Sequence, residues 1–269
     1  MASRALLIVE GSGIEEKFFS PIREKYGFDM EIVPYCGNVS MLFDDMAKNG
    51  FYANIVGLLK LRETEPEKLA ILNGRYTDIF VVLDFDPQHG IEQKAGESKD
   101  EALRRNVQNV SVKAMEMAKR MDNSTDPTAG MLYINYPSME SFRDMDDFCD
   151  NGYGERFILL KDLVKSFGGD GYKAIVGRRK MQKNPAKYSL ENYNSIVLSN
   201  VMKLNRILGG AWGKPSYDDF RRQSSQVDIL LKQLEYVDQG LALGVLNTSV
   251  FLIVDYKGKL FYEGLGENS

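Results

Sequence analysis

Residues 78–86 read DIFVVLDFD, a run of apolar side chains that ends in two acids. The run is rich in β-branched and aromatic residues and does not alternate with polar ones. Such a continuous apolar run is typical of a strand that is covered on both faces, as in a parallel sheet. Residues 5–10, ALLIVE, have the same form and also end in an acid. The two stretches therefore predict two central strands of one parallel sheet.

Strand and helix patterns alternate along the first 145 residues. The predicted strands are residues 5–9, 30–35, 78–83 and 131–134. The predicted helices are residues 14–26, 39–48, 54–73 and 100–121. This alternation predicts an α/β fold over residues 1–145, with a parallel four-stranded sheet flanked by helices.

The pattern changes in residues 146–269, where we expect a mostly helical C-terminal region, packed on the sheet. Helical spacing covers residues 157–167, 188–208 and 217–234. Residues 246–256 and 259–262 flank a Lys257-Gly258 turn, which favours a hairpin or a strand addition.

Composition limits the kinds of protein to consider. The chain has 269 residues and a formal net charge of −4, which excludes a globally basic nucleic-acid coat but leaves room for a local basic patch. The N-terminal apolar run is too short for a secretory leader, and no stretch approaches the roughly 18 apolar residues of a membrane span. With two cysteines, Cys36 and Cys149, we expect a reduced, cytoplasmic protein without a membrane segment. Cys36 is expected to be buried or inert.

Three acids follow the two central strands directly. Glu10 ends the first strand, and Asp84 and Asp86 follow the third. Side chains two residues apart in extended chain lie on the same side, and the carboxyl ends of parallel strands share one edge of the sheet. Close carboxylates repel one another unless a cation neutralises them, and Mg²⁺ prefers oxygen ligands. The sequence therefore predicts a Mg²⁺ (or Mn²⁺) site on these three residues.

Further acids lie near the fourth strand. Glu140 follows that strand by six residues, so it is either a second-metal ligand or a carboxylate that favours a helix start. The acids at positions 144, 146, 147 and 150 are expected to form a solvated face. His89, in the loop after the aspartate pair, is expected to be incidental rather than a proton-transfer group.

A basic segment lies between residues 161 and 187. In a chain of negative net charge, this segment is a candidate contact for a nucleic-acid backbone, although a basic run is also often only a solubilising surface. The candidate nucleic-acid-binding residues are Lys173, Arg178, Arg179, Lys180 and Lys183.

Other known nucleotide-binding and metal-binding motifs match this sequence less well than a metal site on the three acids. Gly11-Ser12-Gly13 begins like a dinucleotide fingerprint, but Glu16 takes the place of the third glycine. The chain has no Gly-Lys-Ser/Thr, so it lacks a P-loop. A Mn²⁺-dependent nucleotide-sugar transferase can use an aspartate pair and remains an alternative, but it leaves Glu10 unexplained.

The first 145 residues resemble the TOPRIM domain, in which a strand ending in Glu-Gly precedes a later strand ending in Asp-x-Asp. Here these motifs are Val9-Glu10-Gly11 and Asp84-Phe85-Asp86. The stretch VEGSGIEEKFF is especially similar to the RloB-like and OLD-type TOPRIM proteins of bacterial abortive-infection systems. Residues 135–142, NYPSMESF, also resemble a stretch that those proteins carry after the fourth strand.

The resemblance implies acid/base or metal chemistry for Glu10 and Mg²⁺ binding for Asp84 and Asp86. The expected function is a Mg²⁺-dependent nuclease that hydrolyses DNA or RNA, in phage defence. The alternative is a latent effector or sensor subunit that works with a partner ATPase, since the chain has no P-loop of its own.

Overall fold

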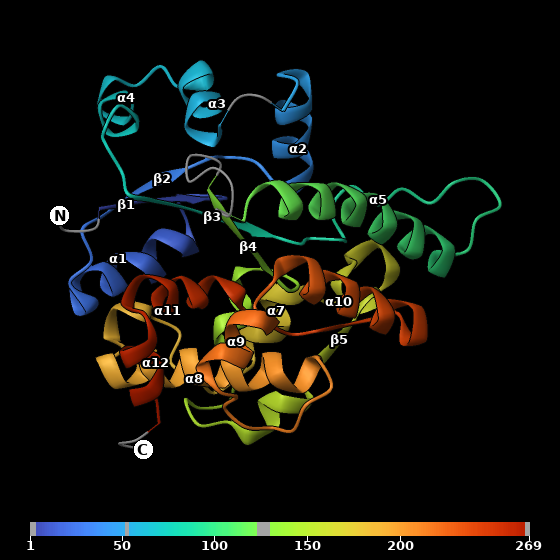
Figure 1. Cartoon of the computed structure of the whole chain (residues 1–269). Helices are drawn as coiled ribbons and strands as arrows, with labels where there is room; N and C mark the ends of the chain where they lie inside the picture. The colour runs from blue at the N-terminus through green and yellow to red at the C-terminus, as the bar shows by residue number, and fades with distance from the viewer. Residues whose placement is uncertain (1–3, 52–53, 123–129, 267–269) are drawn as a thin grey trace.

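The computed structural model describes residues 4–51, 54–122 and 130–266. Its centre is a four-stranded, all-parallel sheet in the order β2-β1-β3-β4, as predicted (Figure 1). The strands are β1 (Ala5–Val9), β2 (Met30–Pro34), β3 (Asp78–Asp84) and β4 (Met131–Asn135). Every residue of β1 is buried, and so is β3 after its first residue, which accounts for their continuous apolar runs.

Helices cover both faces of the sheet (Figure 1). One face carries α1 (Ile14–Tyr26) and helices of the C-terminal region. The other face carries α2 (Val39–Lys48), α3 (Ile55–Arg62), α4 (Pro66–Leu72) and α5 (Lys99–Arg120). The single helix predicted over residues 54–73 is two helices, because the chain is extended before Pro66, which is the first residue of α4.

The order of the strands creates a switch point between β1 and β3. The chain leaves β1 toward β2 on one side, and then returns to place β3 on the other side. In open α/β sheets, ligands bind in the crevice outside the carboxyl ends of strands at such a point. Glu10 and Asp84 stand at these two strand ends.

Local sequence signals set several helix ends. Ser98 and Glu101 form a capping box at the start of α5. Gly27 ends α1 in the left-handed conformation, at φ 63°.

The C-terminal region is mostly helical, as predicted. Its short elements are the 3₁₀ helices η2 (Met139–Arg143), η3 (Asn151–Glu155), η4 (Lys165–Phe167), η5 (Pro185–Lys187) and η6 (Thr248–Val250), and an antiparallel pair of strands, β5 (Phe157–Leu159) and β6 (Ala242–Gly244). Its α-helices are α6 (Leu160–Leu163), α7 (Tyr172–Gly177), α8 (Leu190–Ile207), α9 (Tyr217–Gln223), α10 (Gln226–Gly240), α11 (Phe251–Lys257) and α12 (Lys259–Gly264).

Three predictions in this region are wrong. Residues 157–167 are not one helix, because residues 157–159 pair with β6 instead. Residues 217–234 form two helices, because the Ser225 side chain accepts a hydrogen bond from the Asp228 amide and starts α10 afresh. Residues 246–262 form η6, α11 and α12 rather than a hairpin. Residues 250–254 are fully buried, and an apolar run of that length does not distinguish a strand from a buried helix.

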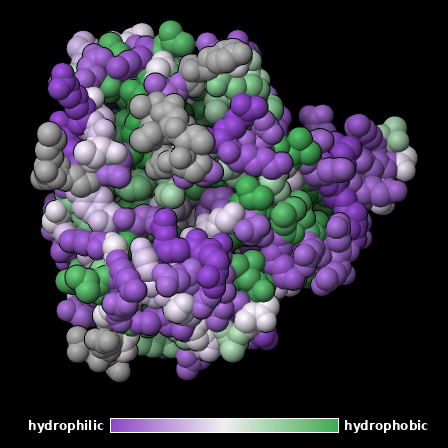
Figure 2. Space-filling view, in the orientation of Figure 1, coloured by the Kyte–Doolittle hydropathy of each residue, from purple (hydrophilic) through white to green (hydrophobic). Residues whose placement is uncertain are grey.

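The two regions share a hydrophobic core. One cluster of buried side chains includes Ile8 and Val82 of the sheet together with Ile196 and Phe251 of the C-terminal region. Helices α5 and α10 pack side by side, and apolar and polar residues of both line a groove of about 640 Å³. Hydrophobic surface is visible in this part of the molecule in Figure 2. In the described part of the chain, no helix is long and apolar enough to cross a membrane.

Candidate metal centre

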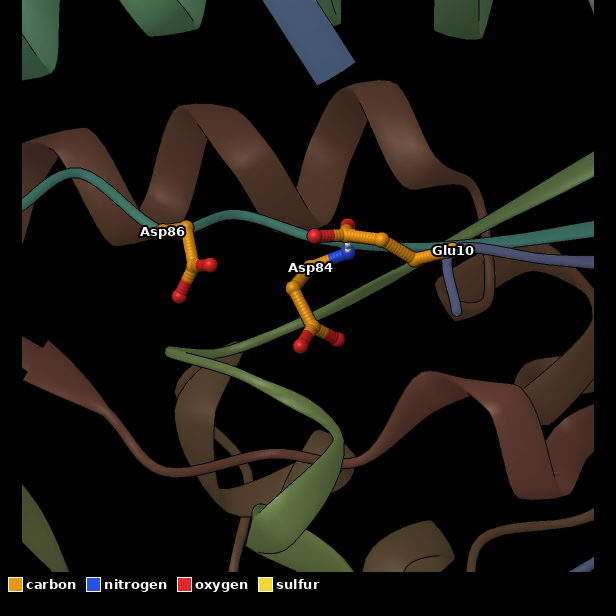
Figure 3. A group of neighbouring side chains, drawn as sticks. All are labelled: Glu10, Asp84 and Asp86. Carbon is orange, nitrogen blue, oxygen red and sulfur yellow. Dashed lines mark hydrogen bonds between the residues drawn. The ribbon is translucent and has the colours of Figure 1, made fainter. Parts of the chain in front are cut away.

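Glu10, Asp84 and Asp86 converge at the carboxyl ends of β1 and β3 (Figure 3). One carboxylate oxygen from each residue lies within 4.8 Å of the others, so the three form a group that can hold a metal ion. Glu10 is half-buried, and Asp84 is 8% exposed. The sequence-based prediction that these acids meet at one edge of the sheet is therefore confirmed.

The backbone holds the three carboxylates in place. The Asp84 amide donates a hydrogen bond of 3.0 Å to Glu10 Oε2, and this bond links the ends of the two strands. Beyond β3, the amide of Phe85 bonds to the Asn135 carbonyl and that of Asp86 to the Pro137 carbonyl. Asp86 has a φ of 39°, in the left-handed region that aspartate tolerates better than most residues. The sequence argument takes residues 84–86 as extended chain, but Asp86 is not extended. The side chains of Asp84 and Asp86 nevertheless lie on the same side of the chain (Figure 3).

Two further glutamates face the same site. Glu15 of α1 and Glu140 of η2 are 6% and 3% exposed, and both line the cavity of about 820 Å³ that contains the three converging acids. The Ser138 hydroxyl donates a hydrogen bond of 2.8 Å to Glu140 Oε2. Glu140 was a candidate in the sequence; it lines the cavity but is outside the group of three close oxygens. Sequence reasoning missed Glu15, although its place at the start of the helix after β1 was a usable signal.

Burial and mutual repulsion oppose the charged forms of these acids. Burial raises the pKa of Glu10 to about 8; the hydrogen bond from Asp84 opposes this shift, and the charge of Asp86 adds to it. Burial is also the first cause that raises the pKa of Asp84 and of Asp86. For Asp84, the next causes are the negative charges of Asp86 and Glu10. A cation among these carboxylates would remove this cost, because it favours their charged forms.

The donor set suits a hard divalent cation. Mg²⁺ and Mn²⁺ favour carboxylate oxygens and water, whereas zinc and copper sites are rich in imidazole and thiolate. Oxygen atoms on one octahedral Mg²⁺ lie about 3–4 Å apart. The separation of 4.8 Å or less is close to that spacing, so the residues fit such an ion.

Lys173 brings a positive charge to the cavity. Its Nζ lies 3.4 Å from Glu140 Oε1, and its side chain is 82% exposed. The charge of Glu140 is the first cause that raises the pKa of Lys173, and Asp86 and Asp84 act in the same direction. Of the five basic residues proposed to bind nucleic acid, Lys173 is the one that lines this cavity.

The other four basic residues lie elsewhere and have different surroundings. Arg178 forms an ion pair of 2.8 Å with Asp170, and both side chains are 61% exposed. Arg179 bonds to the buried Asp144 at 2.6 Å. The Lys183 ammonium group donates to the carbonyls of Val176 (3.1 Å) and Arg179. Lys180 is exposed.

The expectation for Asp144 is wrong. Asp144 is 1% exposed and accepts hydrogen bonds from Arg179 and from the Tyr172 hydroxyl (2.9 Å), so it is part of the interior rather than of a solvated acidic face. Asp146 and Asp147 are exposed, as expected. Cys36, which was expected to be buried or inert, is exposed; it follows β2 closely and has a φ of 59°. His89 is exposed and lines the cavity.

Comparisons of the chain with models of protein families, with curated proteins and with solved structures find no match. The chemistry of the site therefore follows from its own side chains. These are the buried Asp84 and the half-buried Glu10 and Asp86 at the switch point of a parallel sheet, with a lysine from a distant part of the chain lining the same cavity.

Proposed function

We propose that this chain is a Mg²⁺-dependent enzyme of the TOPRIM kind that hydrolyses phosphodiester bonds in DNA or RNA. The observation that carries the proposal is the convergence of Glu10, Asp84 and Asp86 at the switch point of the sheet. A cation would favour the charged forms of carboxylates grouped at this position, and phosphoryl-transfer sites use such cations to offset charge on the phosphate. The resemblance to TOPRIM proteins of phage defence supplies the biological setting for the proposal.

In this proposal, the acids have distinct roles. Asp84 and Asp86 hold Mg²⁺, which when bound offsets the negative charge that develops on the scissile phosphate. Glu10 Oε2 is held by the Asp84 amide, and Oε1 is assigned to proton transfer at the attacking or leaving oxygen. Glu140 and Glu15 extend the acidic surface of the cavity, and Glu140 is the candidate for a second cation.

Lys173 is the residue that we assign to the substrate phosphate. Its side chain lines the cavity, its ammonium group lies beside Glu140 and it is largely exposed, so we assign it to contact a non-bridging phosphate oxygen of a bound substrate. Arg178, Lys180 and Lys183 are proposed to contact the nucleic-acid backbone farther from the scissile bond.

The test is cleavage of end-labelled single-stranded and double-stranded DNA and RNA, tRNA included, with Mg²⁺, with Mn²⁺ and with EDTA. We expect metal-dependent cleavage by the wild type and a loss of at least about a hundredfold in Glu10→Gln and Asp84→Asn. Glu16→Gln is the matched control, because Glu16 is an exposed carboxylate next to Glu15. Cleavage by all variants at the wild-type rate would show that the activity does not come from this site.

Two other outcomes would assign the site differently. Cleavage that appears only after a partner ATPase is added would identify the chain as a latent effector subunit. Stabilisation by UDP- or GDP-sugars with Mn²⁺, without cleavage of any nucleic acid, would favour a sugar transferase and refute the nuclease.

A further inference from the structure

A short segment of the C-terminal region, Asn247–Ser249, lies directly behind the acidic site. All three of its residues are fully buried. The preceding residue, Leu246, forms an isolated antiparallel bridge with Tyr136, just after β4. The Thr248 hydroxyl donates a hydrogen bond of 2.8 Å to the Ile134 carbonyl. This segment is therefore joined to the end of β4, more than 100 residues earlier in the chain.

Asn135 connects the segment to Asp84. It is fully buried at the end of β4, where it is the register partner of Asp84. Its Nδ2 donates to Asp84 Oδ1 over 3.4 Å, and its Oδ1 accepts a hydrogen bond of 3.1 Å from the Ser249 amide. Because Ser249 occupies Oδ1, the amide group of Asn135 is oriented with its donor toward the Asp84 carboxylate.

Asn247 connects the same segment to the residues on both sides of Glu140. Its Nδ2 donates to the Met139 carbonyl (3.0 Å) and to Ser141 Oγ (3.2 Å). Its Oδ1 accepts a hydrogen bond of 2.6 Å from the Ser249 hydroxyl. The buried side-chain amide of Asn247 thus holds the two residues that flank Glu140 in η2.

We propose that Asn135 and Asn247 are positioning residues, through which the segment Asn247–Ser249 sets the distance and orientation of Asp84 and Glu140. The inference rests on the proposed function, because it assumes that these acids serve one metal site. Residues that orient metal ligands commonly change metal affinity when they are substituted, although they do not touch the ion. On this basis the C-terminal region helps to position the acids of the site, in addition to packing against the sheet.

The experiment compares substitutions of fully buried side-chain amides that lie beside the site with the substitution of one that lies away from it. Asn135→Leu and Asn247→Leu each remove a fully buried amide that bonds toward the acids. Gln233→Leu is the matched control, because Gln233 is also fully buried and makes two hydrogen bonds to Gly244, of 2.9 and 2.8 Å, away from the site. Ser249→Ala is a milder variant that removes one hydroxyl and keeps the backbone bond to Asn135. Folding is checked by circular dichroism, and Mn²⁺ affinity is measured by electron paramagnetic resonance of the free ion.

We expect the Kd for Mn²⁺ to rise at least about tenfold in Asn135→Leu and Asn247→Leu, and by a smaller factor in Ser249→Ala. In Gln233→Leu the Kd should stay within about twofold of the wild type. Wild-type affinity in all the folded variants would overturn the inference and leave the metal site intact. A wild-type protein that binds no Mn²⁺ would refute the metal site, and with it both the proposed function and this inference. Weaker binding in the variants, together with a wild type that cleaves no nucleic acid, would refute the nuclease alone.

Discussion

The Glu10 carboxylate is bonded to the backbone amide of Asp84, at 3.0 Å, across 74 residues of sequence. The bond joins the carboxyl ends of β1 and β3 at the switch point of the sheet. The Glu10 side chain is thus oriented by the backbone of Asp84, its neighbour in the group of three acids. A displacement at the end of one of these strands should therefore also displace the acid at the end of the other.

A neutral side chain at position 10 should stabilise the metal-free protein. Glu10→Gln keeps an acceptor for the Asp84 amide but removes a carboxyl group whose raised pKa obliges the folded protein at pH 7.5 either to take up a proton or to hold an unfavourable charge. In EDTA at pH 7.5, we expect the free energy of unfolding to rise by about 1–2 kcal/mol; this is less than the full pKa shift because Glu10 is partly exposed. Urea unfolding measures the difference, with Glu16→Gln as the control.

Saturating Mg²⁺ should stabilise the wild type more than a variant that lacks one of the three carboxylates. A ligand at a hundred times its Kd stabilises a folded protein by about 2.7 kcal/mol. The wild type should gain this amount and Asp84→Asn should gain little. Equal gains in the two proteins would place the bound ion somewhere else.

Substitution of Lys173 should impair the reaction without loss of the metal. Lys173→Met removes the charge beside Glu140, whereas Lys173→Arg keeps it. We expect cleavage to fall about 10- to 100-fold in the methionine variant and to recover in part in the arginine variant. Lys60→Met, an exposed residue of α3 outside the basic segment, is the control. Mn²⁺ affinity measured in parallel separates substrate contact from collapse of the acidic site.

Arg179 should matter for stability rather than for nucleic-acid affinity. Its guanidinium group neutralises Asp144, whose carboxylate is buried, so Arg179→Met leaves an unpaired charge in the interior. We expect a loss of about 2–3 kcal/mol, below the usual value for a fully buried pair because Arg179 is partly exposed. Arg178→Met should change stability little, since its pair with Asp170 is exposed. Chemical unfolding of the two variants provides the comparison, and equal stabilities would contradict the assignment.

Lys203 should make stability depend on pH. It is fully buried in α8, its Nζ donates to the carbonyls of Gly154 and Arg156 at 2.8 Å each, and burial lowers its pKa to about 7. The unfolded chain keeps this proton up to a pH of about 10.4, so the unfolded state binds more protons between these values. Stability therefore rises with pH over this window, and the cost of the buried charge is fully present below pH 7.

The Lys203→Met variant tests this dependence. Between pH 7 and 9, the wild type should gain about 2 kcal/mol relative to the variant, as measured by urea unfolding. Lys187→Met, at an exposed position, should keep the wild-type pH dependence. A parallel change in the wild type and in Lys203→Met would show that other groups cause it.

Local sequence patterns predicted the secondary structure correctly where a segment had one clear pattern of apolar residues. The buried strands β1 and β3 could be read from uninterrupted apolar runs, and α5 from its periodicity. The same reasoning failed for residues 250–254, because burial on every side removes the periodicity that separates helix from strand. It also failed for Asp144, whose partners Arg179 and Tyr172 are 35 and 28 residues away.

The sequence by itself determined the centre of the site. Glu10, Asp84 and Asp86 follow apolar runs, and the carboxyl ends of parallel strands necessarily share one edge, so these acids could be brought together without coordinates. The tertiary structure decided what surrounds them. Lys173 meets Glu140, and Asn247 supports the residues beside Glu140, through contacts between segments that no local pattern relates. Such contacts arise from the packing of the C-terminal region onto β4, which depends on the whole hydrophobic core and not on the spacing of any one motif.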